Sequence, residues 1–368
     1  MLRPKSFRNF IDRLGFDRVI LLSFILLNTT GLLTLWGIGD AVRPFFFRQL
    51  WFVLIGLVVM ALAAHFDYRI FKNYSRATLL VYLAALVLLA VTLFSGSVRG
   101  ISAWISIGSL RLEPSEFAKL AVVILLAKYF SIKHVEIYRV HHLIASGFYV
   151  GLPALLILMQ PDLGSAIVLG AIWLAMLLAA GIKRKHLLVM LILGLVMAVA
   201  AWFYLLAPYQ KGRISSFVNP YLDPKGEGYS IIQAKVALGS GGWWGNGLGQ
   251  GTQARFGFLP EAHTDFAVAA LGEQFGWAGL VATLGILFVM LRRIGQIGFR
   301  MGNNFAKLFA IGLMTFIFCH ILINAGMNLG VMPITGIPFP FISYGGSFML
   351  ALTLGLGLIQ SIGRTARG

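Results

Sequence analysis

The sequence predicts an all-α integral membrane protein with about ten membrane-spanning helices. Of its 368 residues, 58% are hydrophobic and only 12% are charged, and the mean hydropathy is +0.84. A soluble domain of this length would not bury so much apolar surface around one core, because a folded chain keeps a large exposed area. The apolar residues also form continuous runs of about twenty, and as helices such runs cross roughly 30 Å of hydrocarbon. Continuous rather than alternating runs favour helices over a barrel.

Ten such runs follow one another, and short polar connections separate most of them. We expect spans at residues 19–38, 46–66, 77–95, 115–132, 143–160, 165–182, 186–207, 264–290, 305–330 and 345–362. Because no long polar region resembles a separate soluble domain, residues 1–368 are predicted to form a single membrane domain.

The net charge of +17 predicts topology and not nucleic-acid binding. With the N-terminus in the cytoplasm, the segments on that side carry 20 of the 30 Lys and Arg residues and four of the 13 acids. This asymmetry is the positive-inside pattern, and it places both termini in the cytoplasm. Within residues 1–17, apolar side chains recur at helical spacing between arginines, which predicts an amphipathic helix on the cytoplasmic surface.

Residues 208–263 form the longest polar stretch, a large extracytoplasmic loop between the seventh and eighth spans. Inside it, residues 229–238 are apolar at helical spacing and predict a short helix near the membrane surface. Seven glycines follow between Gly239 and Gly251. They predict a flexible loop, with a phosphate-binding nest as the alternative.

Residues 331–344 are mostly apolar but contain Pro333, Pro338 and Pro340, which exclude a regular helix. Such a stretch either dips into the membrane while packed on protein or forms a tight apolar connector. Composition favours neither of these two interpretations.

Glu116 and Lys119 begin the fourth expected span, directly after Pro114. Their i,i+3 spacing puts both side chains on one helix face, where opposite charges neutralise each other. Charges inside hydrocarbon are costly, so the pair is either a structural ion pair or part of a polar cavity. On these residues alone, the structural pair is favoured.

Three further ionisable residues lie beside spans. Asp162 is placed to cap the sixth span, and Arg48 lies at the outer end of the second, where its side chain reaches the interface. Asp265 begins the eighth span, where the helix dipole favours a carboxylate. The functional alternative is a general base at the mouth of a membrane cavity, with Lys119 nearby keeping it ionised.

The sequence offers few other candidate sites. Glu273 lies inside the eighth expected span and needs a partner or water there. The histidines show no metal-ligand spacing, and no Cys-x-x-Cys, His-Glu-x-x-His or Gly-x-Ser-x-Gly motif is present. The single cysteine, Cys319, excludes a disulfide within the chain.

Five blocks of the sequence resemble the SEDS (shape, elongation, division and sporulation) family over nearly the whole chain. The order and spacing of these blocks make the resemblance specific. The blocks are Trp104-Ile105 ahead of Glu113-Pro-Ser-Glu-Phe-Ala-Lys119, then Gln160-Pro-Asp-Leu-Gly164, Gly228-Tyr-Ser-Ile-Ile-Gln233, Leu259-Pro-Glu-Ala-His-Thr-Asp265 and Gly336-Ile-Pro-Phe-Pro-Phe-Ile-Ser-Tyr-Gly-Gly-Ser347. Ser240-Gly-Gly242 and Gly251-Thr-Gln253 look more like the RodA branch of the family than the FtsW branch.

The resemblance implies a peptidoglycan glycosyltransferase of the bacterial cytoplasmic membrane that uses lipid II, extends a nascent glycan chain and works with a class B penicillin-binding protein. Asp265 matches the family's catalytic aspartate, and Glu116 and Lys119 match polar residues of its central cavity. Further cavity or substrate-binding residues are expected at Arg48, Asp162, Arg213 and His263. The sequence departs from the family where Glu113 replaces a usual Gln and Ala103 a common Arg.

In the implied reaction, Asp265 takes a proton from the acceptor sugar's 4-hydroxyl as that oxygen displaces undecaprenyl diphosphate with inversion. Arg48, Lys119 and Arg213 would stabilise the departing diphosphate. A divalent cation, Mg or Mn, would assist, although the sequence has no carboxylate cluster dedicated to one. The alternatives are a lipid II flippase, a scaffold that recruits a transpeptidase, and a division-type member of the same family.

Overall fold

The computed structural model describes residues 16–94, 103–108, 110–133, 140–204, 206 and 208–365. Ten long helices fill the described part of the chain. They are α2 (Arg18–Ile38), α3 (Arg43–His65), α5 (Ser75–Leu93), α6 (Pro114–Lys133), α7 (Val140–Met159), α8 (Leu163–Ala180), α9 (Arg184–Tyr204), α13 (Ala267–Arg300), α14 (Asn304–Leu329) and α15 (Gly346–Thr365). Two short pieces, η1 (Asp40–Val42) and α4 (Arg69–Asn73), join neighbouring long helices.

These ten helices confirm the expected spans to within a few residues at most boundaries. Nine of them are long and apolar enough to cross a membrane. The tenth, α6, has 20 residues and carries Glu116, Lys119 and Lys128 along its length. The predicted amphipathic helix over residues 1–17 lies outside the described residues except for its last two.

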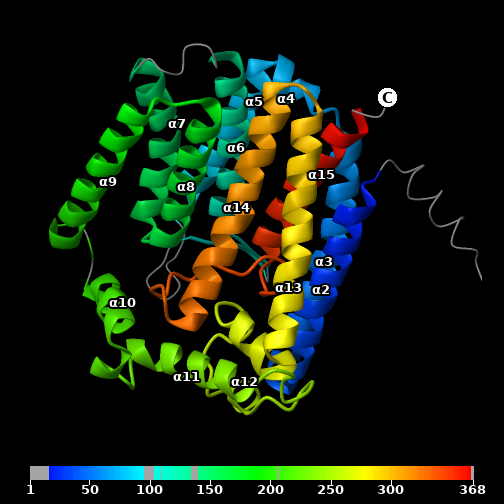
Figure 1. Cartoon of the computed structure of the whole chain (residues 1–368), viewed down its shortest axis with the longest axis vertical. Helices are drawn as coiled ribbons and strands as arrows, with labels where there is room; N and C mark the ends of the chain where they lie inside the picture. The colour runs from blue at the N-terminus through cyan, green and yellow to red at the C-terminus, as the bar shows by residue number, and fades with distance from the viewer. Residues whose placement is uncertain are drawn as a thin grey trace, which may run out of the picture.

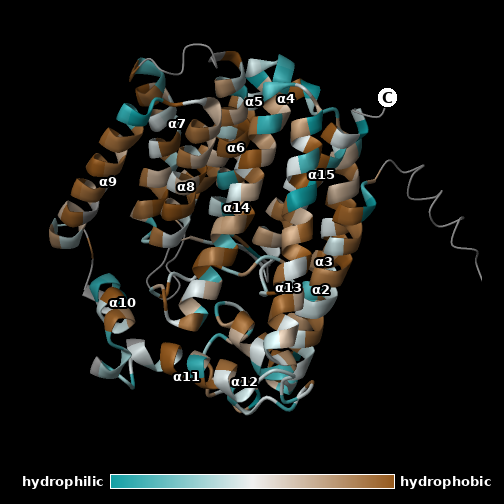
Figure 2. Ribbon diagram, viewed as in Figure 1, coloured by the Kyte–Doolittle hydropathy of each residue, from teal (hydrophilic) through white to brown (hydrophobic). Residues whose placement is uncertain are grey.

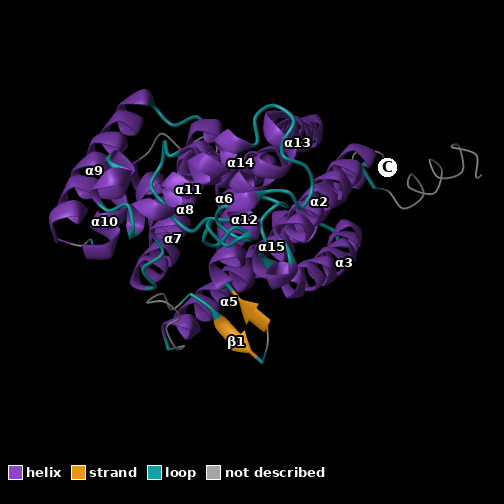
Figure 3. Cartoon of the chain, turned by 90° about the horizontal axis from the view of Figure 1, so that it is seen from below, coloured by secondary structure: helices purple, strands orange, loops and turns teal. Residues whose placement is uncertain are grey.

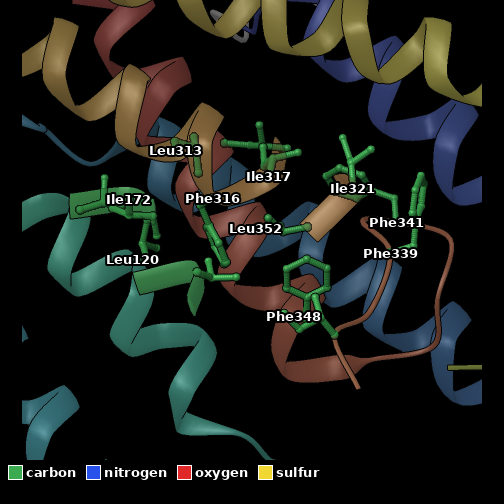
Figure 4. Close-up of a cluster of buried hydrophobic side chains, with 14 of the residues drawn as sticks. Leu120, Ile172, Leu313, Phe316, Ile317, Ile321, Phe339, Phe341, Phe348 and Leu352 are labelled. Carbon is green, nitrogen blue, oxygen red and sulfur yellow. The ribbon is translucent and has the colours of Figure 1, made fainter. Parts of the chain in front are cut away.

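The core of the bundle is built by α6, α14 and α15. Helix α15 packs along α3 and α6, and α14 packs along α6, α8 and α13. Their facing side chains form one continuous apolar cluster (Figure 4). Its members in the figure include Leu120, Ile172, Leu313, Phe316, Ile317 and Phe348, all at most 4% exposed.

Helix α9 stands at the edge of the bundle (Figure 1), and none of its span is buried. Beyond its first turn α9 is coloured mostly as hydrophobic (Figure 2), and large apolar side chains such as Ile144 of α7, Ile167 of α8 and Leu195 of α9 are exposed. Such surfaces suit contact with lipid, because hydrocarbon imposes no cost on exposed apolar side chains. Figure 2 shows polar residues gathered at the two ends of the bundle instead.

The start of α2 and the ends of α13 and α15 meet at one end of the bundle. Asp17 caps α2 by accepting from the amides of Val19 and Ile20, and its Oδ2 accepts from Arg293 Nη2 at 2.6 Å. The Asp17 amide donates to Gln360 Oε1 at 2.6 Å. Both ends of the described chain therefore lie on the same side, with the C-terminus marked in Figure 1.

At the opposite end, four short helices of the 208–263 loop lie beneath the long helices (Figure 1). They are α10 (Pro208–Val218), η2 (Pro220–Leu222), α11 (Glu227–Ser240) and α12 (Thr252–Arg255). The helix predicted over residues 229–238 is confirmed as the middle of α11. The α11 helix packs on α13 and α14, so this loop is a cover attached to the bundle.

The expected span at 264–290 is wrong in its details, because α13 consists of two helical pieces. Gly276 separates them with φ 67° and ψ −169°, a conformation that is essentially restricted to glycine. The glycine-rich segment 241–251 docks at this break through backbone hydrogen bonds. The amides of Trp277 and Ala278 donate to Gly242 and Trp243, while the Asn246 amide donates to the Glu273 carbonyl.

Glu273 lies in the first piece of α13 and is fully buried. Its carboxylate accepts from the amides of Gln253 at 2.7 Å and Ala254 at 3.0 Å, which satisfies donors at the start of α12. The partner expected for this buried acid is therefore the backbone of the loop cover.

A two-stranded antiparallel hairpin, β1 (Ile105–Ile107) and β2 (Leu110–Leu112), precedes α6 and was not expected from the sequence. Figure 3 shows it at the periphery of the bundle. The segment 331–344 packs on protein, which agrees with both interpretations considered for it. Its residues Ile337, Phe339, Phe341 and Ile342 are at most 2% exposed, and Figure 4 shows two of them against α14.

Candidate active site

Lys119 lies at the centre of a buried polar cluster in the first turns of α6. Its Nζ donates to Glu116 Oε1 at 2.8 Å and to Ser165 Oγ at 3.3 Å, and lies 3.1 Å from His320 Nε2. The side chains of Lys119 and Glu116 are 0% and 2% exposed. The predicted ion pair is therefore present, and it belongs to a network from three helices, α6, α8 and α14.

The other oxygen of this pair, Glu116 Oε2, is buried and makes no hydrogen bond. His320 Nε2 lies 3.9 Å from it. An unsatisfied buried carboxylate oxygen is costly, and it gives the cluster a capacity to accept one more hydrogen bond.

Asp162 is the N-cap of α8, as predicted, and its Oδ1 accepts from the Ser165 amide at 3.0 Å. Because Ser165 Oγ accepts from Lys119, Asp162 adjoins the Lys119 cluster through one residue. The capping role predicted for Asp162 is therefore confirmed, and its expected role in substrate binding stays a prediction.

Glu113 lies next to the same cluster, immediately before α6. The residue is half-buried, and its Oε1 accepts from the hydroxyl of the fully buried Ser115 at 3.0 Å. Burial, with a further contribution from the nearby charges of Glu116 and Asp162, raises the pKa of Glu113 to about 8. Near neutral pH this carboxyl group is therefore largely protonated.

Asp265 lies two residues before the first residue of α13, at the end of the bundle that the loop covers. Its carbonyl oxygen accepts from Asn324 Nδ2 at 3.0 Å and from Asn328 Nδ2 at 3.1 Å. Both asparagines belong to α14 and are fully buried. The backbone of Asp265 is thus attached to one of the central helices.

His263 lies two residues before Asp265, at the same end of the bundle. Its ring packs on Phe45 of α3 with centroids 4.3 Å apart, and its carbonyl accepts from the Tyr344 amide at 2.8 Å. Arg48 is exposed on α3, one helical turn after Phe45. The structure therefore brings His263 and the region of Arg48 together.

Segment 331–344 lies close to Asp265 and also contacts the Lys119 cluster. The Pro338 carbonyl lies 3.1 Å from His320 Nδ1, and the Ile337 carbonyl accepts from Asn324 Nδ2 at 2.7 Å. A Cβ added to Gly336 would lie 3.9 Å from Asp265 Oδ2, so the carboxylate faces this segment. Gly336 has φ 74°, a conformation that favours glycine.

Arg213 lies in the loop cover and not on the helices that carry the Lys119 cluster. It is half-buried on α10, which packs mainly on α11 and η2 in the loop cover. Sequence reasoning missed the polar residues of α14, although His320, Asn324 and Asn328 recur every fourth residue inside an apolar span. That spacing was the available signal, since it places three costly polar groups on one helix face.

Among the described residues, no group of three His, Cys, Asp or Glu side chains is arranged to hold a metal ion. The carboxylates near Lys119 do not form such a set.

Comparisons with known proteins agree with this architecture. The model of the FtsW/RodA/SpoVE family, described as "Cell cycle protein", matches residues 13–368. The peptidoglycan glycosyltransferase MrdB of Escherichia coli K12 is 33% identical over 362 residues, covering 96% of this chain and 95% of MrdB.

Two solved structures have the same fold. A chain from a peptidoglycan synthase complex that coordinates polymerization and crosslinking superposes with a TM-score of 0.82 at 28% identity, covering 95% of this chain and 98% of that one. The rod shape determining protein RodA of Thermus thermophilus gives a TM-score of 0.70 at 26% identity, with coverages of 96% and 98%. Since the family model spans almost the entire chain, the protein belongs to the FtsW/RodA/SpoVE, or SEDS, family.

Proposed function

We propose that this protein is a peptidoglycan glycosyltransferase that polymerises lipid II at the outer face of the bacterial cytoplasmic membrane. The observation that carries the proposal is the placement of Asp265. Its backbone is fixed by two buried asparagines and its carboxylate faces Gly336, in a segment that also contacts the Lys119 cluster. An acid whose backbone is held in place, and which faces a segment that also contacts the buried Lys119 cluster, is suited to general-base chemistry.

In this mechanism Asp265 accepts the proton of the acceptor sugar's 4-hydroxyl while the oxygen attacks the anomeric carbon of the donor chain. The bond to undecaprenyl diphosphate breaks as the new glycosidic bond forms, and the anomeric centre inverts. Lys119 and the exposed Arg48 supply positive charge for the departing diphosphate. Arg213 would do so from the loop cover.

A flippase would need polar groups along a path through the membrane. Along α6, the eight residues from Leu120 to Ala127 separate Lys119 from Lys128, and all are apolar and at most 8% exposed. Phe316 and Ile317 of α14 close the same level of the bundle, and Figure 4 shows this apolar layer. The polar cluster thus lies in the half nearer the loop cover, which favours chemistry over transport.

The proposal includes a class B penicillin-binding protein as partner and a role in cell elongation. A similar chain belongs to a peptidoglycan synthase complex that coordinates polymerization and crosslinking, which supports such a partner. The segments Ser240-Gly-Gly242 and Gly251-Thr-Gln253 support the elongation branch over the division branch.

The test is polymerisation of labelled lipid II by the purified protein with its transpeptidase, comparing wild type with Asp265→Asn at matched folding and partner binding. We expect glycan chains from the wild type and none from the variant. If both proteins make chains, Asp265 is not the base. If neither does with verified substrate and partner, transport of lipid II becomes the function to test.

The proposed orientation places both termini in the cytoplasm. Single-cysteine variants Lys225→Cys, in the loop cover, and Lys185→Cys, at the start of α9, are made after Cys319→Ala removes the native thiol; both positions are exposed. An impermeant maleimide applied to intact cells should label position 225 and spare position 185. Labelling in the reverse pattern would overturn the orientation.

A further inference from the structure

Helix α14 carries a stripe of three polar side chains along one face. His320, Asn324 and Asn328 follow at intervals of four residues, and all three are 0% exposed. In a spanning helix, buried polar groups are costly unless they are paired. The partners of these three residues lie on the segments that form the candidate active site.

Asn328 uses both ends of its amide on the residues around the start of α13. Its Oδ1 accepts from the Ala269 amide at 3.0 Å, and its Nδ2 donates to the Asp265 carbonyl at 3.1 Å. Ala269 is the third residue of α13, where the backbone donor has no partner within the helix. The N-cap residue, Phe266, has no side chain for this task, so Asn328 caps the helix from α14.

Asn324 joins Asp265 to the segment that its carboxylate faces. Its Nδ2 donates to the Asp265 carbonyl at 3.0 Å and to the Ile337 carbonyl at 2.7 Å. Asn324 Oδ1 in turn accepts from Asn328 Nδ2 at 3.1 Å. Because Ile337 follows Gly336, the two asparagines fix the separation between Asp265 and this segment.

His320 continues the stripe to the Lys119 cluster. With the tautomer that protonates Nδ1, the ring donates to the Pro338 carbonyl at 3.1 Å and accepts at Nε2 from Lys119 Nζ at 3.1 Å. The ring stacks on Phe348 with centroids 4.2 Å apart and an interplanar angle of 15°, which restricts its rotation.

We infer that Asn324 and Asn328 are positioning residues for Asp265, and that His320 positions Lys119 relative to the same segment. The stripe connects Asp265 and the Lys119 cluster, which come from distant parts of the chain, to the same helix, α14. This inference rests on the proposed function, because it assigns the stripe a role in polymerisation. Misplacement of a reacting group by about 1 Å costs roughly 100-fold in rate.

The experiment compares Asn328→Ala and Asn324→Ala with Thr315→Ala in the full-length protein with its transpeptidase. Thr315 is a matched control, because it is a polar residue of α14 whose hydroxyl donates to Ile311 O of the same helix at 2.9 Å. Lipid II turnover is measured as kcat and KM. Hydrogen exchange of the peptides covering 265–275 and 277–300 is followed in the same preparations.

We expect kcat to fall about 10- to 100-fold in Asn328→Ala, less in Asn324→Ala and not in Thr315→Ala. KM for lipid II should stay within about threefold, because Asp265 acts in the chemical step. Exchange should rise in 265–275 and not in 277–300. Asn324→Ala keeps the cap from Asn328 and serves if Asn328→Ala does not fold.

Wild-type kcat with faster exchange at 265–275 would overturn the positioning role, as would a reduced kcat with unchanged exchange there. An increase in KM alone would overturn it as well, since it would place the asparagines in substrate binding. If the wild type makes no glycan, the proposed function fails. In that case the anchoring role is judged from hydrogen exchange alone. Unchanged exchange at 265–275 in the asparagine variants would contradict it.

Discussion

Lys119 and Glu116 form an ion pair 2.8 Å long whose two side chains are almost completely enclosed by protein. A buried pair seldom stabilises a protein more than well-packed apolar residues would, because both charges lose their hydration. Stabilisation alone therefore does not explain the presence of this ion pair in the middle of a helical bundle. The neighbouring His320 and the unsatisfied Glu116 Oε2 are consistent with the role in the reaction that we propose for Lys119.

A double-mutant cycle separates the structural role of this pair from its role in the reaction. Glu116→Gln or Lys119→Met alone leaves a buried charge without its partner and should lower the free energy of unfolding by about 3–5 kcal/mol. The double variant should recover much of that loss. Polymerisation should stay defective in the double variant, because the positive charge is missing. Recovered polymerisation would mean that the pair is only structural.

The spans could be predicted because a run of about twenty apolar residues is a local property of the sequence. The break at Gly276 could not, since a glycine within an apolar run also occurs in unbroken helices. Its conformation depends on segment 241–251, which lies about thirty residues earlier and docks through backbone hydrogen bonds. From its composition the glycine-rich segment is expected to be flexible, because the backbone groups to which it binds are distant in the sequence.

The ionisable residues of the site could be predicted, because charged side chains in or beside membrane spans are costly and therefore stand out in the sequence. Glu116, Lys119 and Asp265 were identified on that ground. Their partners were not, because Asn324 and His320 approach them only when α14 packs against α6 and the start of α13. Uncharged amides in an apolar helix give a weaker signal than ionisable groups.

Replacing Glu113 by Gln should alter the pH dependence of stability. The pKa of Glu113 is raised to about 8 by burial, so the folded state holds its proton at pH values where the unfolded chain, with a pKa near 4.5, has lost it. Stability contributed by the neutral carboxyl is complete below about pH 4.5 and is lost as the pH rises toward 8. Glu113→Gln should remove this loss.

The measurement is the Tm of both proteins in detergent between pH 5 and pH 8.5. The variant should match the wild type at pH 5 and exceed it at pH 8. Equal Tm values throughout would show that Glu113 is not protonated by burial. A glutamine is the usual family residue here, and a protonated glutamate has nearly its shape and also offers a donor and an acceptor.

The contact between Asp17 and Arg293 should stabilise the end of the bundle where α2, α13 and α15 meet. Asp17→Ala removes a hydrogen-bonded charge pair and the cap of α2 together, and should cost about 2–3 kcal/mol. Asp40→Ala is the matched control, because Asp40 pairs with Arg43 at a similar 2.9 Å but its side chain is 89% exposed. Exposed pairs contribute about 0–1 kcal/mol.

Unfolding of both variants in denaturant, monitored by tryptophan fluorescence, gives the comparison. Equal losses from Asp17→Ala and Asp40→Ala would contradict the role assigned to burial.

Gly276→Ala should detach the glycine-rich segment from the break in α13. The new methyl group would meet Trp243 O at 2.5 Å, and the backbone conformation itself costs a non-glycine residue roughly 1–3 kcal/mol. Gly285→Ala is the control, because that glycine lies later in the same helix with no atom within 4 Å of an added Cβ. This control should be neutral or stabilising by up to about 1 kcal/mol.

Limited proteolysis and Tm report on the two variants. Cleavage within 241–251 should accelerate in Gly276→Ala and stay at the wild-type rate in Gly285→Ala. Glu273 and the start of α13 contact the same glycine-rich segment. Lipid II polymerisation should therefore fall when the segment becomes sensitive to protease. Rapid cleavage with full activity would show that the loop cover and the site of Asp265 are independent.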